Sequence, residues 1–166
     1  METHSNIGSI MILVEGSTKN KRRLAEEAAL FAWKELFPRI NNCIIEIHLK
    51  KMDGYQGTCE QIDDREYELQ IDSKQSYEDF VTCIFHEMVH VKQYIRKELF
   101  SECVFWKTRE EYLNLPWEIE AYEKQEVLLE RWKVHLESHL QKNQKSIKVG
   151  GIITKILSSN KCVELC

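Results

Sequence analysis

Two histidines and a glutamate lie within one short segment, where the chain reads His86-Glu87-Met88-Val89-His90. On a helix, residues four apart project from one face, so the imidazoles of His86 and His90 would lie one above the other. Two imidazoles placed in this way suit two ligand positions around a tetrahedral zinc ion. Glu87 follows the first histidine, and its carboxylate can reach a metal-bound water without binding the metal, which is where a general base belongs. The segment therefore predicts a zinc centre that activates water.

The element that must position this motif is a helix, expected from about Ser76 to Lys97. Acidic residues follow Ser76, as suits the first turn of a helix, where the backbone dipole favours negative charge. The apolar side chains form one narrow stripe that we expect to pack on the core. His86 and His90 project almost opposite this stripe, so we expect a core on one side of the helix and a metal cleft on the other. In the alternative interpretation, the histidines are exposed or hydrogen-bonded and Glu87 is there by chance. The stripe consists of Val81, Ile84, Met88, Val91 and Ile95.

A zinc site with two histidines needs a third protein ligand. A second long helix is expected from Pro116 to about Lys142, because proline is favoured in the first helical turn. Glu118 lies on the apolar face of this helix, where a carboxylate is costly to bury unless it is paired or binds a metal. We therefore predict Glu118 as the third ligand, with Glu120, which lies roughly opposite, as the fallback. Alternatively, Glu118 lies in the first turn only because its negative charge interacts favourably with the helix dipole. The rest of the apolar face is Ala121, Tyr122, Gln125, Leu129, Trp132 and Leu136.

These motifs together resemble those of a known family. The pattern His86-Glu87-x-x-His90, followed after 27 residues by Glu118-x-x-Ala121, is similar to that of the gluzincin metallopeptidases, especially minimal ones. The string Pro-Trp-Glu-Ile-Glu-Ala also resembles small peptidase-like proteins, including phage-encoded ones.

The resemblance covers roughly residues 66–125 and implies a zincin-like α+β fold. In such a fold, a small mixed or antiparallel sheet packs on an active-site helix and on a second, ligand-bearing helix. The strand just before the active-site helix forms the edge of the cleft, where a peptide substrate adds as an extra strand. Residues 66–71 are the matching segment here. Many gluzincins have an Asp that orients a ligating histidine where this chain has Tyr122, so Tyr122 or another residue is expected to fill that role.

The activity that the resemblance implies is zinc-dependent hydrolysis of a bond in a peptide or protein substrate. The Zn²⁺ ion polarises the scissile carbonyl and lowers the pKa of a bound water. Glu87 takes the proton as the water attacks and passes it to the leaving amine. The developing oxyanion needs a hydrogen-bond donor, for which Tyr112 is a candidate and Tyr94 a weaker one.

Two other functions stay open. One alternative is a non-catalytic interaction module stabilised by zinc, or a degenerate peptidase. A structural zinc, however, needs no base such as Glu87 and usually has four protein ligands. The SprT-like proteases, which act on DNA-bound proteins, also resemble this chain around the first motif. Their third ligand is usually a histidine, however, and His135 and His139 lie far along the second helix.

The composition indicates one domain without a membrane segment. The chain has 166 residues, 43% of them hydrophobic, so we expect a single domain over residues 1–145 and a C-terminal extension over residues 146–166. The net charge of −4 argues against a globally basic nucleic-acid binder. A basic stretch between Lys142 and Lys155 is typical of a solvated tail. The sequence leaves the oligomeric state open.

The cysteines favour a reducing compartment. No two of them form a C-x-x-C pair, which suits reduced thiols in a cytoplasmic protein better than a disulfide framework. No signal peptide is visible, because the apolar run at residues 10–14 is short, and no stretch reaches the roughly 20 apolar residues of a membrane span. Cys162 and Cys166 could hold a second metal but are more simply tail thiols. The remaining cysteines are Cys43, Cys59, Cys83 and Cys103.

Other elements are expected on both sides of the motif helix. The order of strands and helices favours the α+β class. Strands are predicted at residues 9–14, 43–49 and 66–71, a helix at residues 18–37, and a turn region at residues 53–57. Short strands are possible at residues 103–107. Residues 147–157 are interpreted as a strand pair or a loose tail.

Overall fold

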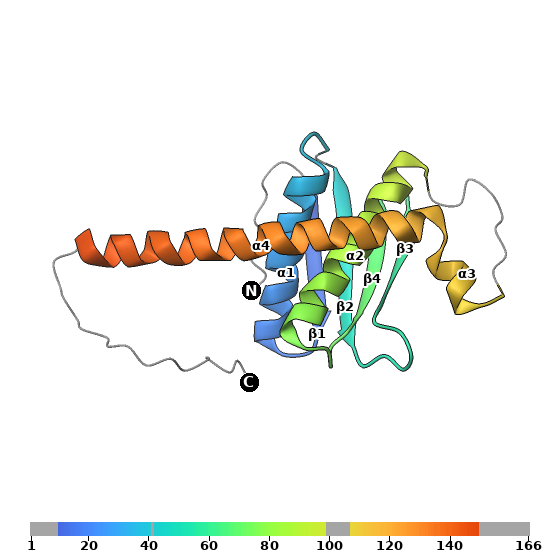
Figure 1. Ribbon diagram of the computed structural model, residues 1–166, viewed down its shortest axis with the longest axis horizontal. Coiled ribbons are helices and arrows are strands. Elements are labelled where there is room, and N and C mark those ends of the chain that lie inside the picture. Colours follow the sequence, from blue (N-terminus) through green and yellow to red (C-terminus); the bar gives the residue numbers. More distant parts are fainter. Residues whose placement is uncertain (1–9, 41, 99–106, 150–166) are drawn as a thin grey trace. The chain divides into compact units, whose positions relative to one another are not determined.

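The computed structural model describes residues 10–40, 42–98 and 107–149, with side chains as far as residue 141 (Figure 1). The fold is mixed α+β, with one four-stranded sheet and helices, as the sequence predicts. Its elements in chain order are β1 (Ile10–Gly16), α1 (Lys19–Leu36), β2 (Cys43–Lys50), β3 (Gly57–Asp63), β4 (Glu66–Asp72), α2 (Tyr77–Arg96), α3 (Arg109–Leu113) and α4 (Pro116–Val149).

The chain divides into two compact units, Met1–Trp132 and Lys133–Cys166. The first unit holds the sheet, α1 to α3 and the first half of α4. The described residues of the second unit continue α4 to Val149. None of the helices in the described part of the chain combines the length and apolarity needed to cross a membrane.

The sheet has the strand order β1-β2-β4-β3. β1, β2 and β4 run parallel, and β3 pairs antiparallel with β4 across a tight turn in which Arg65 has a φ of 65°. Side chains of β2 and β4 alternate between buried and half-buried, so one face of the sheet belongs to the core. α1 packs on β1, and α2 packs on β3 and β4 (Figure 1). The sheet therefore supports α2 along much of its length.

The helix that carries the histidine motif has well-defined ends. Ser76 caps its N-terminus by accepting a hydrogen bond from the backbone of Asp79, and Lys97 ends it in the left-handed conformation. α2 also joins an aromatic cluster, in which the rings of Phe85, Phe31 on α1 and Trp132 on α4 lie within 6.2 Å of one another. These contacts fix α2 against both neighbouring helices.

The structure corrects the predicted edge of the sheet. The strand predicted at residues 66–71 exists as β4, but it lies between β2 and β3 and so has no free edge for a substrate strand. The outermost strand on this side is β3, Gly57–Asp63, most of which the sequence did not indicate because its apolar residues do not alternate. β3 is a strand because the hairpin pairs it with β4.

Smaller differences concern the C-terminal part. The short helix α3 was not expected, and α4 continues past Lys142 to Val149. A strand pair that begins at Ile147 is therefore wrong for residues 147–149, which are helical. The expected strands at residues 103–107 fall almost wholly outside the described residues, as do residues 150–157 and Ser9.

Candidate metal centre

Two helices bring three candidate ligands together. His86 and His90 project from α2, and Glu118 projects from the first turn of α4. The two Nε2 atoms lie 3.1 Å apart. The Glu118 carboxylate spans both rings, with Oε2 3.4 Å from Nε2 of His86 and Oε1 3.3 Å from Nε2 of His90. These side chains are 13%, 9% and 2% exposed, respectively, so the group is almost enclosed.

Two glutamine amides fix the orientation of the imidazoles. Gln93 Nε2 donates to the carbonyl of Trp117 at 2.8 Å and to Glu120 at 2.9 Å, so its Oε1 must face Nδ1 of His90, 2.8 Å away. Gln125 Nε2 donates to the carboxylate of Glu126 at 3.2 Å, so its Oε1 faces Nδ1 of His86 at 2.9 Å. Both Nδ1 atoms must then carry the ring proton.

The consequence is a convergence of acceptors. With protons on both Nδ1 atoms, the neutral rings of His86 and His90 direct Nε2 lone pairs at each other and at a carboxylate that has no proton. Such a set repels itself unless a proton or a metal cation lies among the three groups. Two ligand atoms at about 2.0–2.1 Å from a tetrahedral zinc are roughly 3.3 Å apart, which matches the observed 3.1–3.4 Å. The donor types and spacing therefore fit zinc.

Glu118 is held as an ionised carboxylate. Its burial acts to raise the pKa in the metal-free protein, but hydrogen bonds from His86 and His90, when these rings carry a proton on Nε2, and from Tyr112 outweigh that effect and lower the pKa to about 2. Among the described residues, His86, His90 and Glu118 are the group whose ligand atoms all lie within 4.8 Å of one another. The structure thus brings together the three residues that the sequence singles out as ligands.

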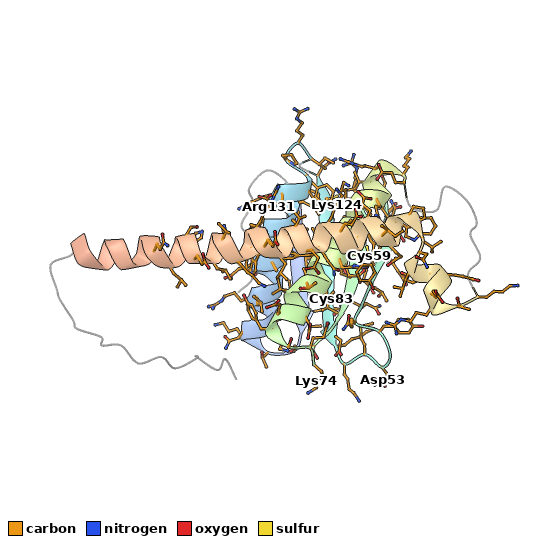
Figure 2. The ribbon with its side chains drawn as sticks, in the orientation of Figure 1. Asp53, Cys59, Lys74, Cys83, Lys124 and Arg131 are labelled. Carbon is orange, nitrogen blue, oxygen red and sulfur yellow. The ribbon has the colours of Figure 1, made fainter. Side chains whose placement is uncertain are left out.

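Glu120, the fallback ligand, faces a different partner. One carboxylate oxygen accepts from the ammonium of Lys92 at 2.6 Å, and the other accepts from Gln93 at 2.9 Å. Lys124, which lies on the same side of α4 as Arg131, also approaches Glu120 at 3.5 Å (Figure 2). Glu120 is absent from the ligand group that contains Glu118.

Glu87 is a second buried carboxylate at the site. It is 5% exposed, and burial raises its pKa, while His90 and His86 offset this effect only in part. A raised pKa brings a carboxylate closer to the working range of a general base. Gly57 at the start of β3 leaves the necessary space, because a Cβ there would lie 2.7 Å from Glu87 Oε1 and 2.6 Å from Cys83 Sγ. Cys83 belongs to α2, below α4 in the view of Figure 2.

The tyrosines occupy distinct places around the ligands. Tyr112 on α3 hydrogen-bonds Glu118, so its hydroxyl lies beside a candidate ligand, and its role as an oxyanion donor stays a prediction. Tyr122 packs its ring edge-on against His86 with centroids 4.8 Å apart, while Gln125 takes the histidine-orienting position. Tyr94, the weaker oxyanion candidate, packs on Tyr67 of β4 with centroids 6.0 Å apart.

Comparisons with known proteins found no relative of this chain. No family model matches it, and neither a curated protein nor a solved structure matches it significantly. The similarity to gluzincins therefore stays a prediction, and the chemistry of the site depends on its own geometry.

Sequence reasoning missed the residues that support the ligands. Gln93, three residues after His90, and Lys92 read as ordinary polar positions of a helix, yet both are buried. Gln125 shares the helix face of Glu118, but its position in the sequence predicts no role. Gly57 was interpreted as part of a turn, although it is the first residue of β3. The signal for Gln93 was its spacing of three residues from His90 on the same helix. Gln125 contacts His86, which lies on the other helix, so spacing along one helix gives no signal for it.

Proposed function

We propose that this protein is a zinc-dependent peptidase with a zincin-like active site. The observation that carries this proposal is the convergence of the Nε2 atoms of His86 and His90 and the Glu118 carboxylate, 3.1–3.4 Å apart, beside the buried carboxylate of Glu87. Three protein ligands next to a separate carboxylate are typical of a catalytic zinc site, which keeps one position open for water.

The ligands and the base have separate tasks. His86, His90 and Glu118 would hold the ion. When bound, zinc supplies a Lewis acid that lowers the pKa of water and polarises a carbonyl. Glu87 accepts a proton from the attacking water and returns it to the leaving amine, a transfer favoured by its raised pKa. Tyr112 would donate to the developing oxyanion after releasing its hydrogen bond to Glu118.

An extended peptide is the substrate that the sheet favours. β3 is the outermost strand of the described sheet and packs on α2, the helix that carries His86, Glu87 and His90. A strand at the edge of a sheet can pair with the backbone of a bound peptide. We therefore expect the substrate to pair with the strand Gly57–Asp63, in place of the segment predicted from the sequence.

The main alternative is a zinc that only stabilises the fold. A structural zinc is usually closed by four protein ligands. Among residues 10–40, 42–98 and 107–149, no fourth His, Cys, Asp or Glu joins His86, His90 and Glu118. A structural site also gives no reason to bury Glu87 beside the ligands. His135 and His139, the candidates for an SprT-like third ligand, lie in the second unit and pair with each other, with ring centroids 4.4 Å apart.

We also propose a cytoplasmic location, because Cys43, Cys59 and Cys83 are free thiols.

The test combines metal content with hydrolysis of a mixed peptide library. We expect the purified protein to bind one zinc ion and to cleave library peptides, with loss of cleavage on chelation. Glu87→Gln should keep the zinc and lose at least about 100-fold of the cleavage rate, as general-base catalysis contributes roughly that much. Glu118→Gln should lose the zinc. Glu123→Gln, at an exposed position of α4, is the matched control. Full cleavage by Glu87→Gln would refute the mechanism.

A further inference from the structure

A buried lysine lies next to the candidate metal centre. Lys92 on α2 is only 4% exposed, and its ammonium contacts Glu120 on α4 at 2.6 Å. Burying a lysine is costly unless a charged partner is fixed in place. The mechanism proposed above does not use this ion pair, so another reason is needed for its position between the two ligand-bearing helices.

The ion pair continues into a chain of hydrogen bonds that ends at a ligand. Glu120 binds Lys92 with one carboxylate oxygen and accepts from Gln93 Nε2 with the other. Gln93 is fully buried, and its Oε1 lies 2.8 Å from Nδ1 of His90. This chain of hydrogen bonds therefore links the ammonium group of Lys92, through Glu120 and Gln93, to the imidazole of His90. His90 is the ring whose Nε2 would bind the metal.

The same chain ties down the third ligand. Gln93 Nε2 also donates to the carbonyl of Trp117, at 2.8 Å. Trp117 and Glu120 lie before and after Glu118 at the start of α4. The hydrogen bonds from Gln93 to Trp117 and to Glu120, one on each side of Glu118, thus hold the start of α4 against α2 near His90.

We propose that Glu120, clamped by Lys92, is a positioning residue that keeps Nε2 of His90 free of its proton. Two acceptors, the Trp117 carbonyl and the Glu120 carboxylate, hold the amide group of Gln93 and leave only its Oε1 for His90. Hydrogen bonds to the outer nitrogen of a ligating histidine fix its tautomer and its orientation. The role in metal binding rests on the proposed function, whereas the effect on the tautomer does not.

The decisive variant is Glu120→Gln. Its new amide oxygen would be taken by Lys92, so its NH₂ group would meet the NH₂ group of Gln93. Gln93 can relieve this repulsion by turning over, with loss of its bond to the Trp117 carbonyl, and it would then offer a donor to Nδ1 of His90, which favours the ring proton on Nε2. Lys124→Met is the matched control, because it removes the exposed cation that approaches the same carboxylate at 3.5 Å.

The first readout is the tautomer of His90 in the metal-free protein, from long-range ¹H–¹⁵N correlation spectra at alkaline pH. We expect the Nδ1–H form in the wild type and in Lys124→Met, and a substantial Nε2–H population in Glu120→Gln. Gln93→Met, which removes the amide and keeps the side-chain length, should show the same change and serves if Glu120→Gln does not fold. A wild-type tautomer in the folded variants would overturn the proposal.

The second readout is zinc affinity, measured by competition with a chromophoric chelator. We expect about 10- to 100-fold weaker binding for Glu120→Gln and Gln93→Met, and wild-type binding for Lys124→Met. A wild type that binds no zinc would refute the proposed function, and the tautomer would still decide the role of Glu120. Unchanged affinity in variants that fold would overturn the positioning role while leaving the proposed function intact.

Discussion

The stability of the metal-free protein should depend on pH through Glu118. In the absence of metal, this carboxylate interacts with His86 and His90, and protonating it removes the charge on which those interactions depend. We therefore expect unfolding in the presence of EDTA to become easier in acid. Replacing Glu118 by Gln, which keeps the shape and removes the charge, should remove most of that pH dependence.

The magnitude follows from the pKa of Glu118. Burial would raise that pKa, but hydrogen bonds from both histidines and Tyr112 bring it from 4.5 to about 2. A tenfold change in proton affinity corresponds to about 1.4 kcal/mol, so the decrease corresponds to about 3 kcal/mol of folding free energy. Solvent screening reduces this little, because the side chain is 2% exposed. For a domain stable by roughly 5–15 kcal/mol, the effect is large.

The sign differs for the two partners of the interaction. A carboxylate with a lowered pKa stabilises the fold fully above its ordinary value of 4.5, and this stabilisation is lost as the pH falls through about 2. For His90, burial lowers the pKa, but the interactions with Glu118 and Glu87 outweigh burial, so the net effect is a raised pKa. The stabilisation that His90 contributes to the fold is therefore complete below pH 6.5 and is lost as the pH rises. Metal-free protein should therefore be most stable between about pH 4.5 and 6.5.

The assay is urea unfolding with EDTA present, followed by tryptophan fluorescence at a series of pH values from 2 to 8. The wild type should lose about 3 kcal/mol more than Glu118→Gln between pH 5 and 2. Glu27→Gln is the control, since Glu27 forms a solvent-exposed pair with Arg23 at 3.5 Å. Equal losses in the wild type and in Glu118→Gln would refute the assignment of the acid dependence to Glu118.

Two further predictions concern the base and the metal. Gly57→Ala places a Cβ 2.7 Å from Glu87 Oε1, so the carboxylate must move. We expect roughly 100-fold lower kcat at unchanged zinc content, because a displaced base no longer reaches the attacking water. An unchanged kcat would contradict the role of Glu87 as the base. Zinc at 100 times its Kd should stabilise the wild type by about 2.7 kcal/mol in thermal or urea unfolding and should not stabilise Glu118→Gln. Equal stabilisation of both proteins by zinc would place the metal elsewhere.

The helices of the site were predictable because local signals determine them. Ser76 and the acidic residues after it mark the start of α2, and Pro116 marks the start of α4. Periodicity then placed His86 and His90 on one face and Glu118 on the apolar face of the second helix. The structure puts the three ligand atoms within 4.8 Å of one another. One-dimensional spacing was sufficient here because all three residues lie on regular helices.

The expectation of an open metal cleft opposite a core stripe was less accurate, for a reason that lies in the packing. α2 has a sheet on one side and the start of α4 on the other, so Glu87 and His90 are buried, as is most of the apolar stripe. Periodicity shows which residues share a face but gives no information on whether a second element covers that face. The cover comes from α4, whose position depends on long-range contacts such as Lys92 with Glu120.

The burial of the histidines and carboxylates, which the sequence did not reveal, also favours the binding of a cation among them. In water, two imidazoles and a carboxylate have no reason to stay 3.1–3.4 Å apart, because solvent can satisfy each of them. In this enclosure the two glutamine amides hold the protons of the neutral rings on the outer nitrogens, so that the inner nitrogens can accept a proton or a metal cation. The same enclosure raises the pKa of Glu87. A cation and a base are therefore both favoured by the packing of one helix pair, and a surface histidine motif with identical spacing would favour neither.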